Sequence, residues 1–178
     1  GVTDLSTSTS TQLEDNTRLL KITSSSADTT LSNLTLTGGR TFGDSRLSRL
    51  ENPYSGGAVY TVSSELVLRD VVLAGNSTAG SFAFGGAIFS QRALGASDRS
   101  EVRIYDSVIS GNRTEGDGAA GGAVATGFFL NGLGTAGLSD LAIYNSVVTD
   151  NETQGRQSAG GALHATGNAY DGGTHFES

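Results

Sequence analysis

The stretch that decides the fold is residues 106–124, DSVISGNRTEGDGAAGGAV, because related versions of it occur twice more in the chain. They are residues 70–88, DVVLAGNSTAGSFAFGGAI, and residues 145–163, NSVVTDNETQGRQSAGGAL. In each copy an asparagine precedes the first glycine of a Gly-Gly-Ala motif by nine positions: Asn76 and Gly85, Asn112 and Gly121, Asn151 and Gly160. A fixed phase between two motifs, with a variable distance between copies, is typical of a solenoid in which one loop per coil can grow.

Alternating apolar and polar residues around these motifs predict short β-strands. Aligning the copies gives three columns of aliphatic residues that face inward. The first column holds Leu66, Leu68, Val102, Ile104, Leu141 and Ile143, the second holds Leu36, Leu73, Ile109 and Val148, and the third holds Val59, Ile88, Val124 and Leu163. The sequence therefore predicts an all-β fold, a right-handed parallel β-helix of about four to five coils with three short strands per coil, stacked roughly 4.8 Å apart.

The repeated glycines, asparagines and aspartates are interpreted as structural residues. Gly-Gly pairs indicate tight corners with no room for a Cβ, and they comprise Gly56, Gly57, Gly85, Gly86, Gly121, Gly122, Gly160 and Gly161. Stacked asparagine side chains can bond along the axis of a β-fold, and we expect this of Asn76, Asn112 and Asn151. Asn and Asp tolerate the left-handed conformation of a corner, which is the role expected of Asn33, Asp70, Asp106 and Asn145.

The whole chain, residues 1–178, is expected to form one β-helix segment of a longer protein. Polar or glycine-rich stretches at 40–55, 93–100 and 131–139 are interpreted as loop insertions. Open coil ends expose unpaired strand edges, so end-to-end self-association is an alternative to continuation into further coils.

Composition narrows the possible partners. The formal net charge of −7 disfavours nucleic acid, because an acidic chain repels phosphates. No apolar run is long enough for a membrane-spanning helix. Cysteine is absent, which excludes disulfides and thiolate metal sites. A cysteine-free, acidic chain rich in Gly, Ser, Thr and Asn is compatible with an extracellular or bacterial cell-surface location.

The Gly-Gly-Ala motifs and the asparagine elements together resemble the polymorphic outer-membrane-protein repeat of bacterial surface proteins. That repeat pairs Gly-Gly-Ala-Ile with Phe-x-x-Asn, and here Leu73, Ile109 and Val148 stand where the family favours Phe. The resemblance covers roughly residues 18–168. It implies a secreted or autotransported module of the outer membrane, acting as an adhesin on a host or neighbouring-cell surface protein or glycan, or as a structural scaffold.

Parallel β-helices also include polysaccharide lyases and hydrolases, so an enzyme is the alternative reading. A pectate-lyase-like site needs a Ca²⁺-binding carboxylate cluster and a basic proton acceptor. The single lysine, Lys21, is far in sequence from the Asp-rich corners, and a polygalacturonase-like Asp-Asp pair is missing. We therefore expect a non-catalytic protein.

Two kinds of binding site are suggested by the columns. Tyr60 and Phe89 align with one another, as do Tyr105 and Tyr144, and exposed stacked aromatics can bind sugar rings or a protein partner. His164 aligns with Tyr60 and Phe89 and is expected to face outward. Stacking that only stabilises the sheet is the alternative for both. Asp70 and Asp106 are candidate ligands for Ca²⁺, with a corner ladder as the simpler interpretation.

Overall fold

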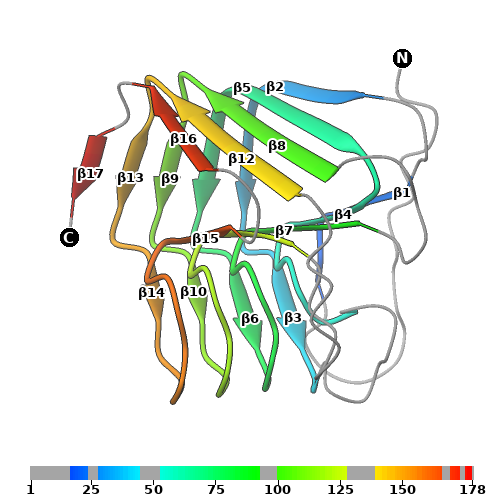
Figure 1. Cartoon of the computed structure of the whole chain (residues 1–178), viewed down its shortest axis with the longest axis vertical. Helices are drawn as coiled ribbons and strands as arrows, with labels where there is room; N and C mark the ends of the chain where they lie inside the picture. Colours follow the sequence, from blue (N-terminus) through cyan, green and yellow to red (C-terminus); the bar gives the residue numbers. More distant parts are fainter. Residues whose placement is uncertain are drawn as a thin grey trace.

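A computed structural model describes residues 17–23, 28–44, 53–92, 100–127 and 139–165, and the backbone of 169–172 and 175–177. Within these residues there is no helix, and the strands pair in parallel to form a β-solenoid of about three turns (Figure 1). The expected four to five coils were slightly too many. Four Gly-Gly-Ala copies, at 56, 85, 121 and 160, enclose only three intervals.

Three sheets run along the solenoid. The five-stranded sheet contains β1 (Leu20–Thr23), β4 (Val59–Val62), β7 (Ile88–Gln91), β11 (Val124–Thr126) and β15 (Leu163–Ala165). The eight-stranded sheet contains β2 (Thr29–Thr37), β5 (Glu65–Ala74), β8 (Ser100–Tyr105), β9 (Val108–Ser110), β12 (Ser139–Tyr144), β13 (Val147–Thr149), β16 (Ala169–Gly172) and β17 (His175–Glu177). The four-stranded sheet contains β3 (Arg40–Phe42), β6 (Ser77–Ala79), β10 (Arg113–Thr114) and β14 (Glu152–Thr153).

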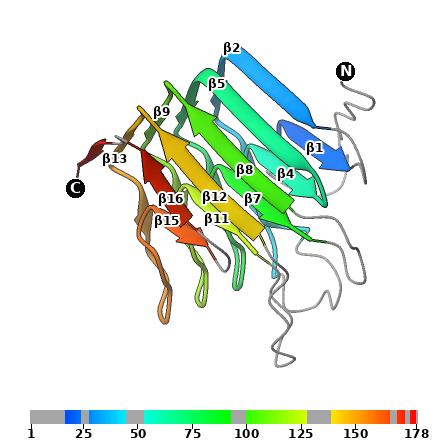
Figure 2. The ribbon, with the colours of Figure 1, turned by 45° about the horizontal axis from the view of Figure 1, so that its top comes forward.

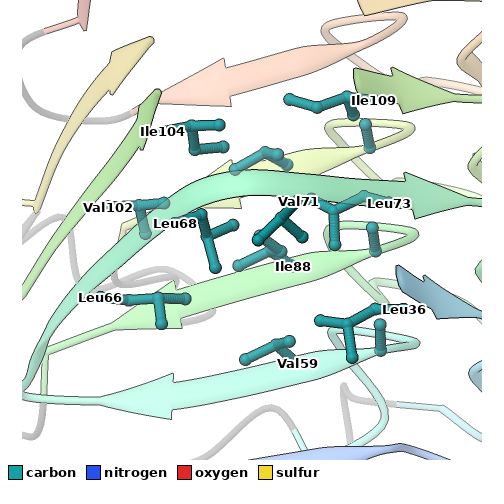
Figure 3. Close-up of a cluster of buried hydrophobic side chains, with 14 of the residues drawn as sticks. Leu36, Val59, Leu66, Leu68, Val71, Leu73, Ile88, Val102, Ile104 and Ile109 are labelled. Atoms are coloured by element: carbon teal, nitrogen blue, oxygen red, sulfur yellow. The ribbon is translucent and has the colours of Figure 1, made fainter. Parts of the chain in front are cut away.

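The three predicted inward columns are confirmed by the strand registers. Leu66 pairs with Val102 and Val102 with Leu141, while the columns that begin at Leu73 and Val59 continue in the same way. These side chains form one hydrophobic cluster inside the solenoid (Figure 3). Full burial of one such aliphatic side chain contributes about 1.5–3 kcal/mol, so stability grows with each coil that is added.

The corner column adopts the expected left-handed conformation. Asn33, Asp70, Asp106 and Asn145 have φ values of 55°, 52°, 51° and 46°. At these residues each coil of the eight-stranded sheet changes direction. For this reason β5 pairs with β8 before its corner and with β9 after it.

A second column, of asparagines, is confirmed as a hydrogen-bonded ladder in the interior. The backbone N–H of Asn76 donates to Oδ1 of Asn112 at 3.0 Å, and that of Asn112 donates to Oδ1 of Asn151 at 3.0 Å. The Nδ2 of Asn112 also donates to the carbonyl of Leu73 at 2.9 Å. Asn76 and Asn112 are completely buried, so each amide satisfies backbone groups that water cannot reach.

The Gly-Gly pairs occupy corners without space for a side chain, as expected. The first glycine has a positive φ, as in Gly85 at 63°, where L-residues with side chains are strained. The second glycine lies against the next coil: a Cβ on Gly86 would lie 2.1 Å from the carbonyl oxygen of Gly122. Gly161 differs from the other second glycines, because a Cβ there would have no described atom within 4 Å.

Each coil also carries a projecting arm, which the sequence did not predict. The arms are residues 76–85, 112–121 and 151–160, and each runs out along a strand of the four-stranded sheet before returning (Figure 1). This explains the constant nine-position spacing, since arms of equal length can stack. A Cβ on Gly80 or Gly116 would lie 1.8 Å from the carbonyl oxygen of the glycine one coil below, so the arms approach closely there.

The predicted loop insertions lie largely outside the described residues, which omit 45–52, 93–99 and 131–138. The described residues correct their edges. Arg40–Phe42, at the start of the expected loop 40–55, forms strand β3, because it pairs with β6. Ser100 and Ser139, at the ends of the other two stretches, begin β8 and β12.

Candidate functional site

The outer side of the eight-stranded sheet carries the candidate site. Strands β2, β5, β8, β12 and β16 lie side by side there, away from the arms (Figure 2). Alternation sends Leu66 and Leu68 of β5 inward and leaves Glu65 and Arg69 on the outer side. Parallel pairing then aligns equivalent outer side chains of successive coils into columns.

One column is a stacked ladder of a cation and two aromatic rings. Register places Arg69, Tyr105 and Tyr144 at successive levels. The guanidinium carbon of Arg69 lies 4.2 Å from the centroid of the Tyr105 ring. The centroids of Tyr105 and Tyr144 are 5.0 Å apart, with an interplanar angle of 11°. Both rings are half-buried and Arg69 is exposed, so the predicted Tyr105–Tyr144 column exists and reaches solvent.

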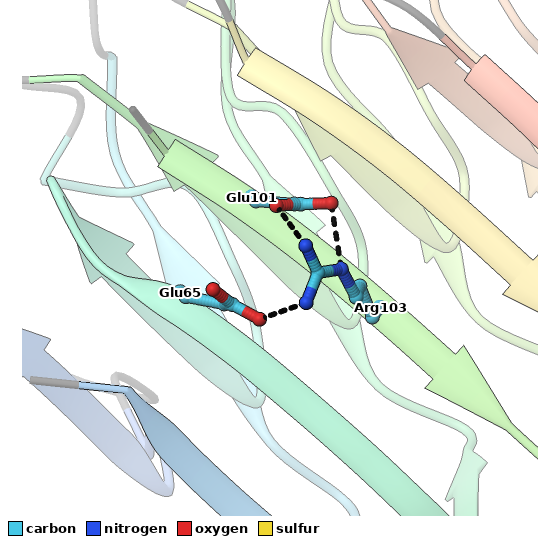
Figure 4. A network of polar contacts seen from close by, with 3 residues as sticks. All are labelled: Glu65, Glu101 and Arg103. Atoms are coloured by element: carbon cyan, nitrogen blue, oxygen red, sulfur yellow. Dashed lines mark hydrogen bonds and ion pairs between the residues drawn. The ribbon is translucent and has the colours of Figure 1, made fainter. Parts of the chain in front are cut away.

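A second column at the start of the same strands is a charge network (Figure 4). The guanidinium of Arg103 binds Glu101 through two hydrogen bonds, from Nε at 2.7 Å and from Nη2 at 2.8 Å, and its Nη1 pairs with Glu65. Partial burial raises the pKa of Glu65 despite the opposing attraction of Arg103, and the negative charges of Asp28 and Glu101 raise it further. The bonds to Glu101 are the largest cause of the raised pKa of Arg103.

The network belongs to a longer run of acids. Asp28 directly precedes β2, whose register with β5 sets it beside Glu65, and Glu101 pairs with Asp140 of β12. Each of four successive levels therefore has one carboxylate at this edge of the sheet. Asp140 is buried, with 8% of its surface exposed. Arg103 binds the two central members of the run.

The prediction that Tyr60 and Phe89 form an exposed aromatic surface is wrong. Tyr60 and Phe89 do stack, with ring centroids 6.0 Å apart, but both are completely buried and offer no exposed binding surface. They are buried because the second half of the arms, which returns to the solenoid, covers them. Phe84 and Ala120 pack over the outer face of the five-stranded sheet and form a second hydrophobic cluster with these rings.

His164 pairs with Ala125 on the five-stranded sheet, in the column predicted for it. Its side chain is half-buried, and this burial lowers the pKa of the imidazole. His164 lies on the five-stranded sheet, whereas the charge network and the two tyrosines lie on the eight-stranded sheet. The structure therefore does not bring the predicted histidine together with the Tyr105–Tyr144 pair.

The calcium candidates, Asp70 and Asp106, are exposed corner residues. The Nδ2 of Asn145 donates to Oδ1 of Asp106 at 2.5 Å, which is the contact expected of a corner ladder. Among the residues whose side chains are described, no group of three or more His, Cys, Asp or Glu side chains is arranged to hold a metal ion.

Sequence reasoning missed the Glu65–Arg103–Glu101 network and the arms. A signal existed for both. An acidic residue lies at or next to the start of each of β2, β5, β8 and β12, at Asp28, Glu65, Glu101 and Asp140. A glycine also follows each ladder position by four residues, as in Gly80 after Asn76 and Gly116 after Asn112.

No helix within the described part of the chain has the length and apolar character needed to cross a membrane. The arrangement that remains is an outer sheet face with a charge network at one edge and an aromatic ladder beside the corner. Comparisons with known protein families, with curated proteins and with solved structures found no match to this chain.

Proposed function

We propose that this chain is a non-catalytic, surface-exposed β-solenoid module that acts as an adhesin or scaffold outside the cell. The observation that supports the proposal most strongly is that the two sides of the eight-stranded sheet carry different kinds of residues. The inner side packs the hydrophobic core. The outer side holds Arg69, Tyr105 and Tyr144 at the surface of a rigid stack.

Such a surface is suited to recognition. Aromatic rings and arginine are the side chains that contribute most often to binding energy at interfaces. Here they are ordered by their neighbours in adjacent coils, so little side-chain entropy is lost when a partner binds. A host or neighbouring-cell surface glycan or protein is the proposed partner class.

The state of the carboxylates supports a non-catalytic role. Glycoside hydrolysis uses a pair of carboxyl groups with space for the sugar between them. Glu65 and Glu101 are instead joined through Arg103, whose guanidinium occupies the space between them. Neither carboxylate is free to act as a general acid or base while that network is intact.

The test is retention of the fluorescently labelled 178-residue chain on intact epithelial cells and on an array of immobilised neutral and acidic oligosaccharides. We expect retention of the natural chain on at least one of these surfaces. The double variant Tyr105→Ala/Tyr144→Ala should lose about fivefold or more, because two ring contacts with a partner at about 0.5–1.5 kcal/mol each sum to about 1–3 kcal/mol. Incubation with pectin and alginate should release no reducing sugar or unsaturated product.

The matched control is Glu152→Gln/Gln154→Ala, which changes two exposed residues of an arm and leaves the outer sheet face unchanged. It should be retained like the natural chain. Equal retention of both double variants, or turnover of either polysaccharide, contradicts the proposal.

A further inference from the structure

The aromatic ladder is asymmetric along the solenoid axis. Tyr105 is covered on one face by Arg69 and on the other by Tyr144. Tyr144 has Tyr105 on one face. On its other side the register places Gly172 of β16 opposite Tyr144, and glycine has no side chain with which to continue the ladder. Tyr105 therefore has a side chain over both of its ring faces, whereas one ring face of Tyr144 is turned toward β16, where the paired residue has no side chain.

The size of that space follows from the strand spacing. Adjacent strands are roughly 4.8 Å apart, and the Tyr105 and Tyr144 rings fill one such interval at 5.0 Å. At the next interval the register places Gly172, which has no side chain, so one further ring of similar thickness matches the strand spacing there. A six-membered sugar ring with an apolar C–H face meets this requirement, because it can stack on an aromatic ring at a comparable distance.

The polar groups beside Tyr144 favour a hydroxylated ligand without negative charge. Asn145 follows Tyr144 at the corner and donates from Nδ2 to Asp106. Both side chains are exposed, and their remaining oxygens can accept hydrogen bonds from sugar hydroxyls. Asp106 and Asp70 are anionic neighbours in the corner column, and the chain has a net charge of −7. Both features disfavour a uronate or sulfated sugar.

From this geometry we propose that Tyr144, with Gly172 opposite it, forms a stacking subsite for one ring of a neutral pyranose oligosaccharide. The proposal rests on the recognition role argued above and specifies its ligand class. An aromatic side chain from a protein partner is the competing occupant. It is less suited because the residues beside Tyr144 at the corner, Asn145 and Asp106, are polar and exposed. A stable protein interface generally needs about 1,000 Å² or more of buried surface with an apolar centre.

The decisive variant is Gly172→Tyr. It adds a third tyrosine above Tyr144, where a strand residue of this type is favoured, and it should fill the subsite without weakening the fold. Isothermal titration of the full chain with cellohexaose, maltohexaose and hexagalacturonate then measures affinity. We expect binding of a neutral hexasaccharide, a loss of about tenfold or more in Gly172→Tyr, and affinity close to that of the natural chain in the control Gly172→Ser.

A second variant keeps the test informative if Gly172→Tyr folds poorly. Tyr144→Leu retains apolar bulk but removes the flat ring, and it should lose a similar factor in affinity with little change in thermal stability. The subsite is refuted if Gly172→Tyr or Tyr144→Leu, shown to be folded, binds the neutral hexasaccharides like the natural chain. It is also refuted if hexagalacturonate alone is bound, or if only a tyrosine-rich peptide is bound.

Failure of the subsite can be told apart from failure of the proposed function. If cells retain Gly172→Tyr as well as the natural chain, yet still lose Tyr105→Ala/Tyr144→Ala, the recognition face stands and the subsite over Gly172 does not. If cells retain all three chains equally, the recognition face itself is wrong.

Discussion

The two aromatic columns of this protein are built alike and end up in different surroundings. Each has an arginine near its first ring: Arg18 lies 5.1 Å from the centroid of Tyr60, which stacks on Phe89, and Arg69 lies 4.2 Å from the centroid of Tyr105, which stacks on Tyr144. Arg69 is in register with its tyrosine, whereas the residue in register with Tyr60 is Lys21. Tyr60 and Phe89 are completely buried, whereas Tyr105 and Tyr144 reach solvent. A side chain that faces away from the solenoid core therefore does not necessarily face water.

The arms account for the difference. Phe84 returns over the five-stranded sheet, with its ring centroid 5.7 Å from that of Phe89. The corresponding side of the eight-stranded sheet has no arm among the described residues (Figure 2). Arg18, beside the covered column, donates hydrogen bonds to the carbonyls of Ser55 and Gly56, and desolvation by burial lowers its pKa to about 10.

The largest expected effect comes from truncating the covered column. Phe89→Ala should lower the free energy of unfolding by about 3–5 kcal/mol, because it leaves a cavity among Tyr60, Phe84 and Ala125. Urea denaturation followed by circular dichroism measures this. A loss below about 1 kcal/mol would mean that the arms do not pack against the sheet as described.

The buried asparagine ladder and the exposed corner column should also differ in how much they contribute to the free energy of unfolding. Asn112→Leu should cost about 2–4 kcal/mol, because it deprives the buried backbone N–H of Asn76 and the carbonyl of Leu73 of their partners. The exposed corner variant Asn145→Ala should cost less than about 1 kcal/mol. Equal losses in the two variants, measured by the same denaturation, would contradict the interior position of the asparagine ladder.

How far the sequence predicts this structure can be judged from these columns. The strand registers and the inward aliphatic residues followed from the repeat phase, since a parallel coil must place equivalent residues above one another. The covering of Tyr60 and Phe89 did not follow, because it depends on a non-local contact with Phe84. The arm strands were also missed: Arg113–Thr114 is only two residues long and shows no alternation. That Gly172 lies opposite Tyr144 could be identified only once β16 was paired with β12.

A smaller effect is expected in the exposed column. Tyr105→Ala removes one stacked ring and one cation–π contact and leaves no buried cavity, so it should cost about 1 kcal/mol. The quantity to measure is the difference between Tyr105→Ala and Phe89→Ala in the loss of unfolding free energy. If Tyr105→Ala destabilised the fold as much as Phe89→Ala, the outer face of the eight-stranded sheet would have to be covered.

The smallest expected effect concerns pH. The raised pKa of Glu65 means that the folded state favours its protonated form, so its contribution to stability is present at acid pH and is lost as pH rises through the raised pKa. Glu65→Gln should therefore become more stable relative to the natural chain as pH rises from about 4 to 7, by less than about 1 kcal/mol. Glu152→Gln, in an exposed arm position outside the network, is the control. A relative gain on acidification instead would reverse the assigned sign.

Cysteine cross-linking can show whether equivalent residues of successive coils lie directly above one another. The chain has no cysteine, and the exposed residues Val108 and Val147 are paired in neighbouring coils while Val72 lies one coil further away. Under mild oxidation, Val108→Cys/Val147→Cys should form an intramolecular disulfide almost completely. Val72→Cys/Val147→Cys should not, because its Cα atoms would lie roughly 9.6 Å apart, beyond disulfide range. Efficient bonding in the second pair, or none in the first, would contradict the stacked register.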